Sequence, residues 1–493
     1  MEIKEEIIGR TEEKKIFSTL LSSKSAELCV IYGRRRIGKT YLVRNYFKQA
    51  VDKNFFMVTG KYKAPRKEQI THFQTELEQI FYGGTRLPQL ASWPKAFQQL
   101  LSAIEICVKN KPHQQIVLFF DELPWLVTQK SNFLETFEHI WNSKLCFYPQ
   151  VKCILCGSAA AWMLNKILYA KGGLHNRVTK QIRLLPFNLK ETAEFLRYNG
   201  LKLNHQQVIE LYMAVGGVAQ YLKQFEKGIS AAQNIGKYFF MQGSFFREEY
   251  NKLFVSLFQD ANIHYKIVTV IAKKRKGFTR EEVIKETKLT SGGFLNEKLR
   301  ELEEAGFIAS FVPFGKKVKD TLYRIIDEYI LFYLKWIKNS SQTLLQDGES
   351  YWLTQKNTPS YDAWSGYSFE NLWLKHAHIL KKSMNIASVV LETSTWSYKV
   401  TDKSEQSGAQ IDLIFDRNDN VVNIFEIKYS SEKFFIQRDY AKKLQNKMDL
   451  FCEKTKTKKQ IFLYFLTLNG LKKNLYSDEI VAGELKADVL FEN

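Results

Sequence analysis

Short apolar runs separated by stretches of helical periodicity dominate the first part of the chain. Four of these runs have few polar interruptions: Leu28–Tyr32, Asn54–Thr59, Gln115–Phe120 and Val151–Cys156. Continuous apolar runs are typical of strands that are buried on both faces, as in a parallel sheet covered by helices. The alternation of such strands with helices therefore predicts a three-layer α/β domain over residues 1–190.

The pattern changes after this domain. Residues 191–259 have helical periodicity, which predicts a helical lid. Between residues 260 and 338, three helical segments precede a hairpin, and Thr279 with Glu282 forms a capping box for the second segment. This order predicts a winged helix. The polar stretch Lys338–Ser350 then predicts a linker to a final α/β domain over residues 350–493.

A glycine-rich segment follows the first apolar run and opens a helix. It matches the P-loop pattern GxxxxGK[ST] in Gly33, Arg34, Arg35, Arg36, Ile37, Gly38, Lys39 and Thr40. In such a loop, successive backbone N–H groups and the helix N-terminus bind phosphates, and the lysine reaches the terminal phosphates. The hydroxyl of Thr40 is a ligand for Mg²⁺. The segment predicts that the chain binds ATP together with Mg²⁺.

Two acidic residues follow the third apolar run. The run delivers Asp121 to the carboxyl end of a strand, where a carboxylate helps to hold Mg²⁺. Glu122, the next residue, is then placed to orient or deprotonate the attacking water. This pair indicates hydrolysis of ATP rather than binding alone, and predicts a P-loop ATPase core.

Two further polar residues each have two interpretations. Ser158 follows the fourth apolar run, where it senses the γ-phosphate or simply ends its strand. Arg177 is an arginine finger that reaches a nucleotide on a neighbouring subunit, or a solvated loop residue. The first interpretation of Arg177 predicts a homo-oligomer, or another protein as partner.

Five motifs occur in order along the chain: GRRRIGKT, FFDELPWL, GSAAAWM, GGVAQYL and YRIIDEYILFYLKWI. Together they resemble the prokaryotic archaeal-type ATPases, which are AAA-related, STAND-like proteins with a winged helix and a C-terminal nuclease-like domain. The resemblance covers nearly the whole chain and implies that Gly9 and Arg10 lie beside the adenine. The sequence departs from the family at two positions. Ala219 stands where a proline commonly follows GGV, and Asn176 replaces the glycine often found before Arg177.

Charged residues occur in a predicted hairpin near the C-terminus. Asp412 lies on the first strand, and Glu426 and Lys428 project from one face of the second. A turn centred on Asp419 places Asp412 opposite Glu426. A two-residue turn centred between residues 418 and 419 places Asp412 opposite Phe425 instead. Both registers remain open.

Two carboxylates and a lysine on a buried strand pair need a shared ligand, because burying them without partners costs free energy. Asp412 and Glu426 suit Mg²⁺, and Lys428 suits the stabilisation of a phosphate under attack. Glu370, on the apolar side of a preceding helix, is a further candidate ligand for the metal. The set resembles the PD-(D/E)XK nucleases, which implies metal-dependent DNA cleavage by a restriction-endonuclease-like domain. Two alternatives stay open: an amphipathic hairpin with a surface ion pair, and a domain that binds without cutting.

The charge of the chain favours a polyanionic partner. Lysine and arginine outnumber aspartate and glutamate by 72 to 52, a formal net charge of +20. The wing of the predicted winged helix adds Lys316, Lys317 and Lys319, which suit contacts with DNA phosphates. The third helix of that domain carries Glu297, Glu301, Glu303 and Glu304. Such a helix suits a DNA groove poorly and favours a protein, so both partners remain candidates.

Membrane insertion and export find no support in the sequence. The N-terminal segment MEIKEEIIGR is charged, and no run of ~18 apolar residues occurs. Cys153 and Cys156 form a lone CxxC in an apolar run, which favours buried thiols over a zinc site. We therefore expect a cytoplasmic protein with no membrane partner.

These predictions combine into one function and one alternative. The first is an ATP-hydrolysing, Mg²⁺-dependent DNA-processing protein, an ATP-regulated nuclease that acts in defence against foreign DNA. The alternative is a STAND-like nucleotide switch, in which ATP controls assembly and the C-terminal domain binds DNA or protein without cutting.

Overall fold

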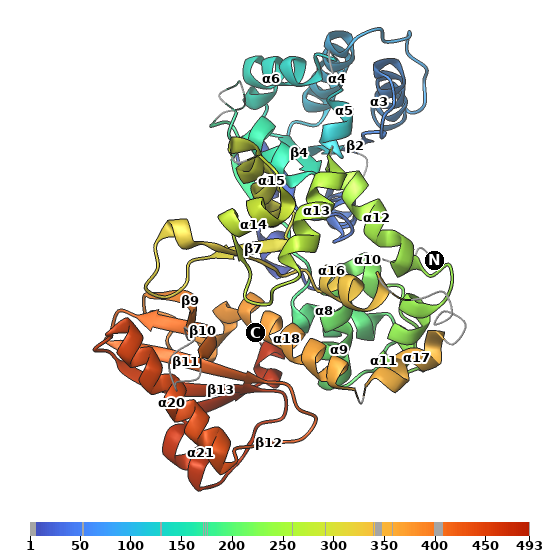
Figure 1. The fold of residues 1–493 in the computed structure, drawn as a ribbon. Coiled ribbons are helices and arrows are strands. Elements are labelled where there is room, and N and C mark those ends of the chain that lie inside the picture. Colours follow the sequence, from blue (N-terminus) through green and yellow to red (C-terminus); the bar gives the residue numbers. More distant parts are fainter. Residues whose placement is uncertain are drawn as a thin grey trace. The chain divides into compact units, whose positions relative to one another are not determined.

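The computed structural model describes residues 6–51, 54–128, 131–170, 172, 174, 176–258, 260–290, 292–338, 340, 348–356, 358–398 and 408–492. The chain divides into two compact units, Met1–Pro186 and Phe187–Asn493 (Figure 1). Most of the predicted linker, Lys338–Ser350, lies outside the described residues. Among the residues that are described, no helix is both long and apolar enough to cross a lipid bilayer.

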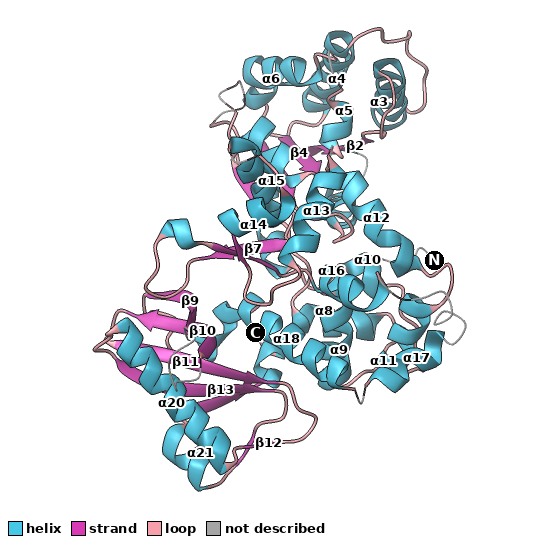
Figure 2. Cartoon of the chain, in the orientation of Figure 1, coloured by secondary structure: helices cyan, strands magenta, loops and turns pink. Residues whose placement is uncertain are grey.

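A parallel sheet of five strands forms the centre of the first unit (Figure 2). Its strands are β1 (Glu27–Tyr32), β2 (Phe55–Thr59), β3 (Ile116–Asp121), β4 (Val151–Gly157) and β5 (Lys180–Arg183), in the spatial order β2-β3-β4-β1-β5. Every neighbouring pair is parallel. The four apolar runs of the sequence are therefore confirmed as strands of a parallel sheet in an α/β unit.

Helices connect these strands. They are α1 (Thr11–Ser22), α2 (Lys39–Val51), α3 (Arg66–Phe81), α4 (Trp93–Asn110), α5 (Leu123–Leu126), α6 (Phe133–Ser143) and α7 (Ala160–Met163). The sequence of α4 shows why such a helix packs on the sheet. Its buried residues include Trp93, Phe97, Leu100 and Ile104, which recur every three or four positions and form one apolar face.

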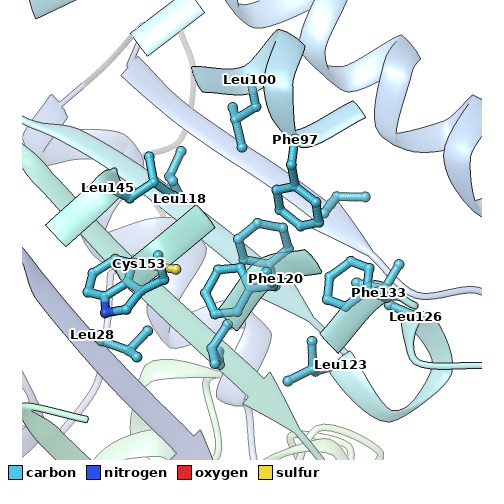
Figure 3. Close-up of a cluster of buried hydrophobic side chains, with 14 of the residues drawn as sticks. Leu28, Phe97, Leu100, Leu118, Phe120, Leu123, Leu126, Phe133, Leu145 and Cys153 are labelled. Carbon is cyan, nitrogen blue, oxygen red and sulfur yellow. The ribbon is translucent and has the colours of Figure 1, made fainter. Parts of the chain in front are cut away.

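Aromatic packing holds the strand that carries Asp121. The ring of Phe120 on β3 lies 6.1 Å from Phe97 of α4, and 6.0 and 5.5 Å from Phe133 and Phe137 of α6, between ring centroids. All four side chains are fully buried, in the cluster that Figure 3 shows. Truncating one such ring costs about 3–5 kcal/mol. The end of β3 and the acidic residues there are thus firmly held.

The second unit begins with helices α8 (Leu189–Tyr198), α9 (His205–Val215), α10 (Ala219–Leu222), α11 (Ala231–Ile235) and α12 (Phe245–Leu257). Asn188 and Glu191 cap α8 reciprocally. The glycine pair after α9 has a steric reason, because a Cβ on Gly217 would lie 1.9 Å from the carbonyl oxygen of Phe187. These helices fall where the sequence predicts them, and their role as a lid stays a prediction.

Three helices and a small antiparallel sheet follow. The helices are α13 (Ala261–Ile271), α14 (Arg280–Thr287) and α15 (Gly293–Glu304). The strands are β6 (Phe278–Thr279), β7 (Ile308–Phe311) and β8 (Leu322–Ile325), in the order β6-β8-β7. The predicted capping box of Thr279 and Glu282 is confirmed at the start of α14. The assignment of residues 260–338 to a winged helix stays a prediction.

The chain ends in a mixed sheet. Helices α16 (Glu328–Phe332), α17 (Gly348–Gln355), α18 (Pro359–Lys375) and α19 (Ala377–Ser383) lead to it, and α20 (Arg438–Thr455) and α21 (Leu475–Ile480) lie between its later strands in sequence. The sheet has the order β15-β13-β11-β10-β9 and consists of β9 (Leu391–Tyr398), β10 (Ala409–Arg417), β11 (Val421–Lys428), β13 (Gln460–Thr467) and β15 (Gly483–Lys486). A separate pair joins β12 (Phe434–Phe435) to β14 (Leu471–Lys472). The structure thus contains a C-terminal α/β sheet, whereas its restriction-endonuclease-like character stays a prediction.

Candidate functional site

The order of the strands determines which residues meet at one edge of the first sheet. Parallel strands end at the same edge, so the phosphate loop after β1, Glu122 after β3 and Ser158 after β4 all lie along it. Because β4 lies between β1 and β3, Ser158 stands between the loop and Glu122. The sequence does not reveal this arrangement, since the same succession of strands is compatible with other spatial orders.

The phosphate loop has a backbone that few residues tolerate. Gly33 has a φ of +149°, and a Cβ there would lie 2.2 Å from the carbonyl oxygen of Leu184. Gly38 has a φ of +92°, in the region that favours glycine. Arg36 has a φ of 73° although it carries a side chain, and strained backbone of this kind occurs mainly at functional positions. Helix α2 begins at Lys39, within the motif, and directs its first N–H groups towards the loop.

Lys39 is buried, and its ammonium group donates three hydrogen bonds. Nζ donates to the carbonyl oxygens of Gly33 at 3.0 Å and Arg34 at 2.9 Å. It also donates to Oγ of Ser158 at 2.9 Å. The lysine that the sequence assigns to the terminal phosphates is therefore held inside the loop by two carbonyl groups, which phosphate oxygens can replace.

Glu122 accepts hydrogen bonds from Ser158. Oγ of Ser158 donates to Oε1 at 2.7 Å, and the backbone N–H of Ser158 donates to Oε2 at 3.3 Å. Glu122 itself has φ and ψ of 46° and 49°, a left-handed conformation that turns the chain sharply between β3 and α5. Lys39, Ser158 and Glu122 thus form one hydrogen-bonded row, and Ser158 is the middle member.

Asp121 lies beside Thr40, as the sequence predicts. Oγ1 of Thr40 donates to Oδ2 of Asp121 at 2.8 Å. Asp121 is 3% exposed. Burial raises the pKa of the Asp121 carboxyl and the charge of Glu122 raises it further, against hydrogen bonds from Thr40 and Cys156 and the charge of Lys39. A hydroxyl beside a buried carboxylate is a donor set that fits hydrated Mg²⁺.

Arg10 contacts the phosphate loop in a way that the sequence analysis did not predict. Its guanidinium is buried, and Nη2 donates to the carbonyl oxygen of Ile37 at 3.1 Å. Nη1 donates to the carbonyl oxygen of Leu185 at 2.8 Å. Arg10 therefore holds the phosphate loop through the backbone of Ile37 and connects it to Leu185. The implied position beside the adenine stays a prediction for both Gly9 and Arg10.

In the second unit, the register of β10 and β11 decides between the two hairpins that the sequence allowed. Leu413 pairs with Phe425 and Ile414 with Ile424, so the hairpin is centred on Asp419. The centre of the hairpin agrees with the first alternative, and the paired residues of the ladder end at Leu413 and Phe425, one position before Asp412 and Glu426. On the other side of β10, the pairing with β9 shifts between Ile411 and Ile414. Asp412 therefore lies in a β-bulge, a feature that redirects side chains and is frequent beside active sites.

Glu426 is buried and surrounded by cationic and hydroxyl donors. Nζ of Lys428 lies 2.9 Å from Oε1, Nζ of Lys447 lies 2.6 Å from Oε2, and the hydroxyl of Tyr440 donates to Oε1. Burial alone would raise the pKa of Glu426, but Lys447, Lys428 and Tyr440 together lower it to about 2. Tyr440 and Lys447 are seven positions apart on α20, a spacing that places them on one helix face. The sequence analysis missed both, although this spacing was a usable signal.

Glu370 of α18 lies beside Arg324 and is affected by the charge of Asp412. Burial raises the pKa of Glu370 to about 7, and the negative charge of Asp412 is the second cause. Nη2 of Arg324 on β8 lies 3.7 Å from Oε2 of Glu370 and acts in the opposite direction. Of the four predicted residues, Glu426 and Lys428 form an ion pair, and the charge of Asp412 acts on Glu370. In the described parts of the chain, no group of three or more histidine, cysteine, aspartate or glutamate side chains is arranged to hold a metal.

Comparison with known proteins gives a family match for the part of the chain that carries the first of these sites. Residues 8–225 match a family described as an ATPase domain predominantly from Archaea. These residues form an archaeal-type ATPase domain. The match spans the phosphate loop, Asp121, Glu122 and Ser158.

Relatives of the whole chain add similarity but no further function. The chain is 25% identical over 438 residues to the uncharacterized protein MJECL04 of Methanocaldococcus jannaschii, covering 86% of this chain and 88% of that protein. The Walker-type ATPase paby2304 of Pyrococcus abyssi is 19% identical, with 67% of this chain and 96% of that chain covered and a TM-score of 0.49. The Aeropyrum pernix ORC2 protein is 13% identical, with 72% and 96% covered and a TM-score of 0.42. Both TM-scores lie below 0.5, too low to establish a common fold over the aligned length.

Two departures from the family pattern have local explanations in the archaeal-type ATPase domain. Asn176 has a φ of 59°, and asparagine is one of the few residues that adopt this left-handed conformation readily in place of glycine. Ala219 is the first residue of α10, where proline is favoured and alanine is also well tolerated. Arg177 itself is exposed, and its role stays a prediction.

Proposed function

We propose that the ATPase domain hydrolyses ATP in a Mg²⁺-dependent reaction in which Glu122 activates the attacking water. The observation that supports this most directly is the hydrogen-bonded row from Lys39 through Ser158 to Glu122. The row connects the group that meets the terminal phosphate to the group that meets the water. A protein that only bound ATP would need the lysine but would have no use for the carboxylate.

The residues of the site divide the reaction between them. The N–H groups of the loop and of the first turn of α2 bind the phosphates. Lys39 exchanges its loop carbonyls for phosphate oxygens. Glu122 accepts a proton from the water whose oxygen attacks the γ-phosphorus, while the bond from that phosphorus to the bridging oxygen of ADP breaks. Thr40 and Asp121 would hold Mg²⁺, which when bound neutralises charge on the phosphates.

Two substitutions test this proposal in the full chain. Lys39→Ala should weaken ATP binding, whereas Glu122→Gln should bind ATP normally and lose at least about 100-fold in kcat. Glu135→Gln, an exposed glutamate on α6, serves as the matched control and should leave both quantities unchanged. Hydrolysis by Glu122→Gln at the wild-type rate would show that another group activates the water.

We also propose, as a second activity, that the C-terminal domain cuts DNA with a divalent metal. The supporting observation is that the charge of Asp412 raises the pKa of Glu370. A divalent cation relieves that repulsion, and Mg²⁺ needs only one or two carboxylates when phosphate oxygens complete its shell. Glu426 keeps Lys428 in place for the phosphate. An ATP-regulated activity of this kind would suit defence against foreign DNA.

Linear, circular and single-stranded DNA, each with and without ATP and Mg²⁺, provide the test. Asp412→Asn and Glu370→Gln should abolish cleavage and spare ATP hydrolysis. Glu392→Gln, an exposed glutamate on β9, is the control and should cut normally. Cleavage that survives the Asp412→Asn, Glu370→Gln double variant would point to another site. No cleavage by wild-type protein on any DNA would favour the nucleotide switch whose C-terminal domain binds without cutting.

A further inference from the structure

The loop between β7 and β8, residues 312–321, is anchored to the C-terminal domain. The backbone N–H of Phe314 donates to the carbonyl oxygen of Thr395 on β9 at 2.8 Å. The ring of Phe314 lies 5.0 Å from the ring of Phe451 on α20, between centroids. Figure 1 shows this loop in yellow, beside the orange strand β9. The loop thereby covers part of an edge strand, whose backbone groups would otherwise be open to pairing.

A row of aromatic rings continues from this anchor to the end of α20. Phe451 packs edge-on against Trp396 at 5.3 Å, and Trp396 lies parallel to Tyr398 at 6.5 Å. Nζ of Lys454 lies over the ring of Tyr398, 5.0 Å from its centroid. These contacts connect the β7–β8 loop to the last turn of α20 through buried and half-buried side chains. The two segments, far apart in sequence, therefore belong to one supported surface.

Lysines gather on both parts of this surface. The loop contributes Lys316, Lys317 and Lys319, the last turn of α20 contributes Lys454, and the residues that follow α20 contribute Lys456 and Lys458, all of them exposed. The carboxylates beside them are fewer: Glu453 pairs with Lys454, and Asp320 accepts a hydrogen bond from the backbone N–H of Lys317. Lys459, the next lysine, is already paired with Asp416. The balance of six lysines against two carboxylates leaves the surface strongly positive.

We propose that these six lysines form one surface that binds the phosphate backbone of duplex DNA. The proposal rests on the DNA partner proposed above and extends it from the loop to α20. Val318, between two of the loop lysines, is 80% exposed, and apolar side chains at such positions insert between base steps of a duplex. Lysines on a rigid support lose less conformational freedom on binding than lysines on a free loop. The sequence alone does not join the two groups, because more than 130 positions separate them.

Binding of a fluorescently labelled 30-base-pair duplex, measured by anisotropy at several salt concentrations in EDTA, tests the surface without cleavage. Three triple variants of the full chain are compared: Lys316, Lys317 and Lys319 to Ala; Lys454, Lys456 and Lys458 to Ala; and, as a control of equal charge in the first unit, Lys95, Lys109 and Lys111 to Ala. We expect each of the first two to reduce the slope of log K against log salt by about 2–3 and to weaken binding at least about tenfold. The control should retain the wild-type slope.

The outcomes separate this inference from the function on which it rests. If the loop variant loses slope and the α20 variant does not, the surface ends at the loop and the inference fails, while the DNA partner stands. If wild-type protein does not bind DNA even at low salt, both proposals fail. Tighter binding of wild-type protein to phosphatidylserine vesicles than to the duplex, lost in both triple variants, would reassign the surface to anionic lipid.

Discussion

At the scale of single residues, Ser158 shows where sequence patterns reach their limit. Its position after an apolar run was clear, yet a sensing role and a strand end were equally compatible with it. What the sequence lacked is the placement of β4 between β1 and β3, which brings Ser158 into contact with Lys39 and Glu122. Thr40 and Asp121 were predictable, because the motif itself specifies both the residue types and the elements that carry them.

Replacement of Ser158 by alanine tests the middle of this row. The variant loses the hydroxyl that accepts from Lys39 and donates to Glu122, whereas the loop N–H groups that bind phosphate are untouched. We expect ATP affinity within about threefold of wild type and kcat lower by about 10- to 100-fold. Steady-state hydrolysis and equilibrium binding of ATP check this, with the exposed Ser143→Ala on α6 as control. An unchanged kcat would reduce Ser158 to the residue that ends its strand.

Glu426 makes a prediction about pH. Its pKa in the folded chain is about 2, below the usual value near 4.3. The ionised form is therefore stabilised by folding, and this contribution is complete above about pH 4.5 and lost as the pH falls towards 2. Glu426→Gln should lower the thermal midpoint of the C-terminal domain at pH 7, by an amount equivalent to on the order of 3 kcal/mol. Calorimetry should show that the difference in thermal midpoint between wild type and Glu426→Gln is smaller at pH 3 than at pH 7. An equal difference at both pH values would mean that lost packing, not lost charge, explains the destabilisation. The control Glu453→Gln, at an exposed residue, should have the thermal midpoint of wild type at both pH values.

At the scale of elements, periodicity and capping predicted the strands and helices well. They did not predict the turns or which elements pack together. The β10–β11 turn is an example. Residues 417–420 all favour turns, so the sequence left its length open. The structure has a three-residue connection in which Asn420 takes a φ of 64°, as in hairpins that end in a left-handed residue. That geometry, rather than any property of Asp412 or Glu426, centres the hairpin on Asp419.

The anchoring of the β7–β8 loop gives a prediction that needs no change of charge. Phe314→Ala removes the ring contact with Phe451 and leaves all six lysines in place. We expect weaker binding of duplex DNA, by about three- to tenfold, because the loop must then be ordered at the moment of binding. Anisotropy measurements as above check it, with Phe294→Ala, an exposed phenylalanine on α15, as the matched control. Equal affinity of Phe314→Ala and wild type would show that the loop binds DNA without its anchor, or not at all.

At the scale of the whole molecule, the chain carries its two candidate sites in separate units. The nucleotide site lies within Met1–Pro186, and the carboxylate pairs lie within Phe187–Asn493. The order of the predicted domains came from the succession of motifs along the sequence. The contacts between distant segments could not be predicted in this way. The hydrogen bonds from Arg10 to Ile37 and from Lys447 to Glu426, for example, leave no local pattern in the sequence. The acidic third helix is a similar case: Glu301 accepts from His264 and Lys298, and Glu303 from Ser310, so part of its charge is internal.

The last prediction concerns assembly and Arg177. Its exposed side chain follows Asn176, whose left-handed φ preserves the turn that a glycine would make. If Arg177 reaches the nucleotide of a neighbouring copy, two inactive variants should complement each other. A Lys39→Ala chain has no working loop but keeps Arg177, and an Arg177→Ala chain has the loop but lacks the arginine. Random mixing at equal concentrations gives about a quarter of the sites both parts, so about a quarter of wild-type hydrolysis should return.

A mixture of Lys39→Ala with Glu122→Gln is the control, because Lys39 and Glu122 of one site come from the same chain, so no site in the mixture has both residues intact. It should stay inactive at every ratio. Full activity of Arg177→Ala alone would show that the residue is a solvated loop arginine. Activity of the first mixture equal to the sum of its separate components would exclude exchange of Arg177 between copies. If the two chains associate by mass action, the ATP hydrolysis recovered in the first mixture should rise with total protein concentration. Such a rise would connect ATP hydrolysis at this edge of the sheet to the association of copies of the chain.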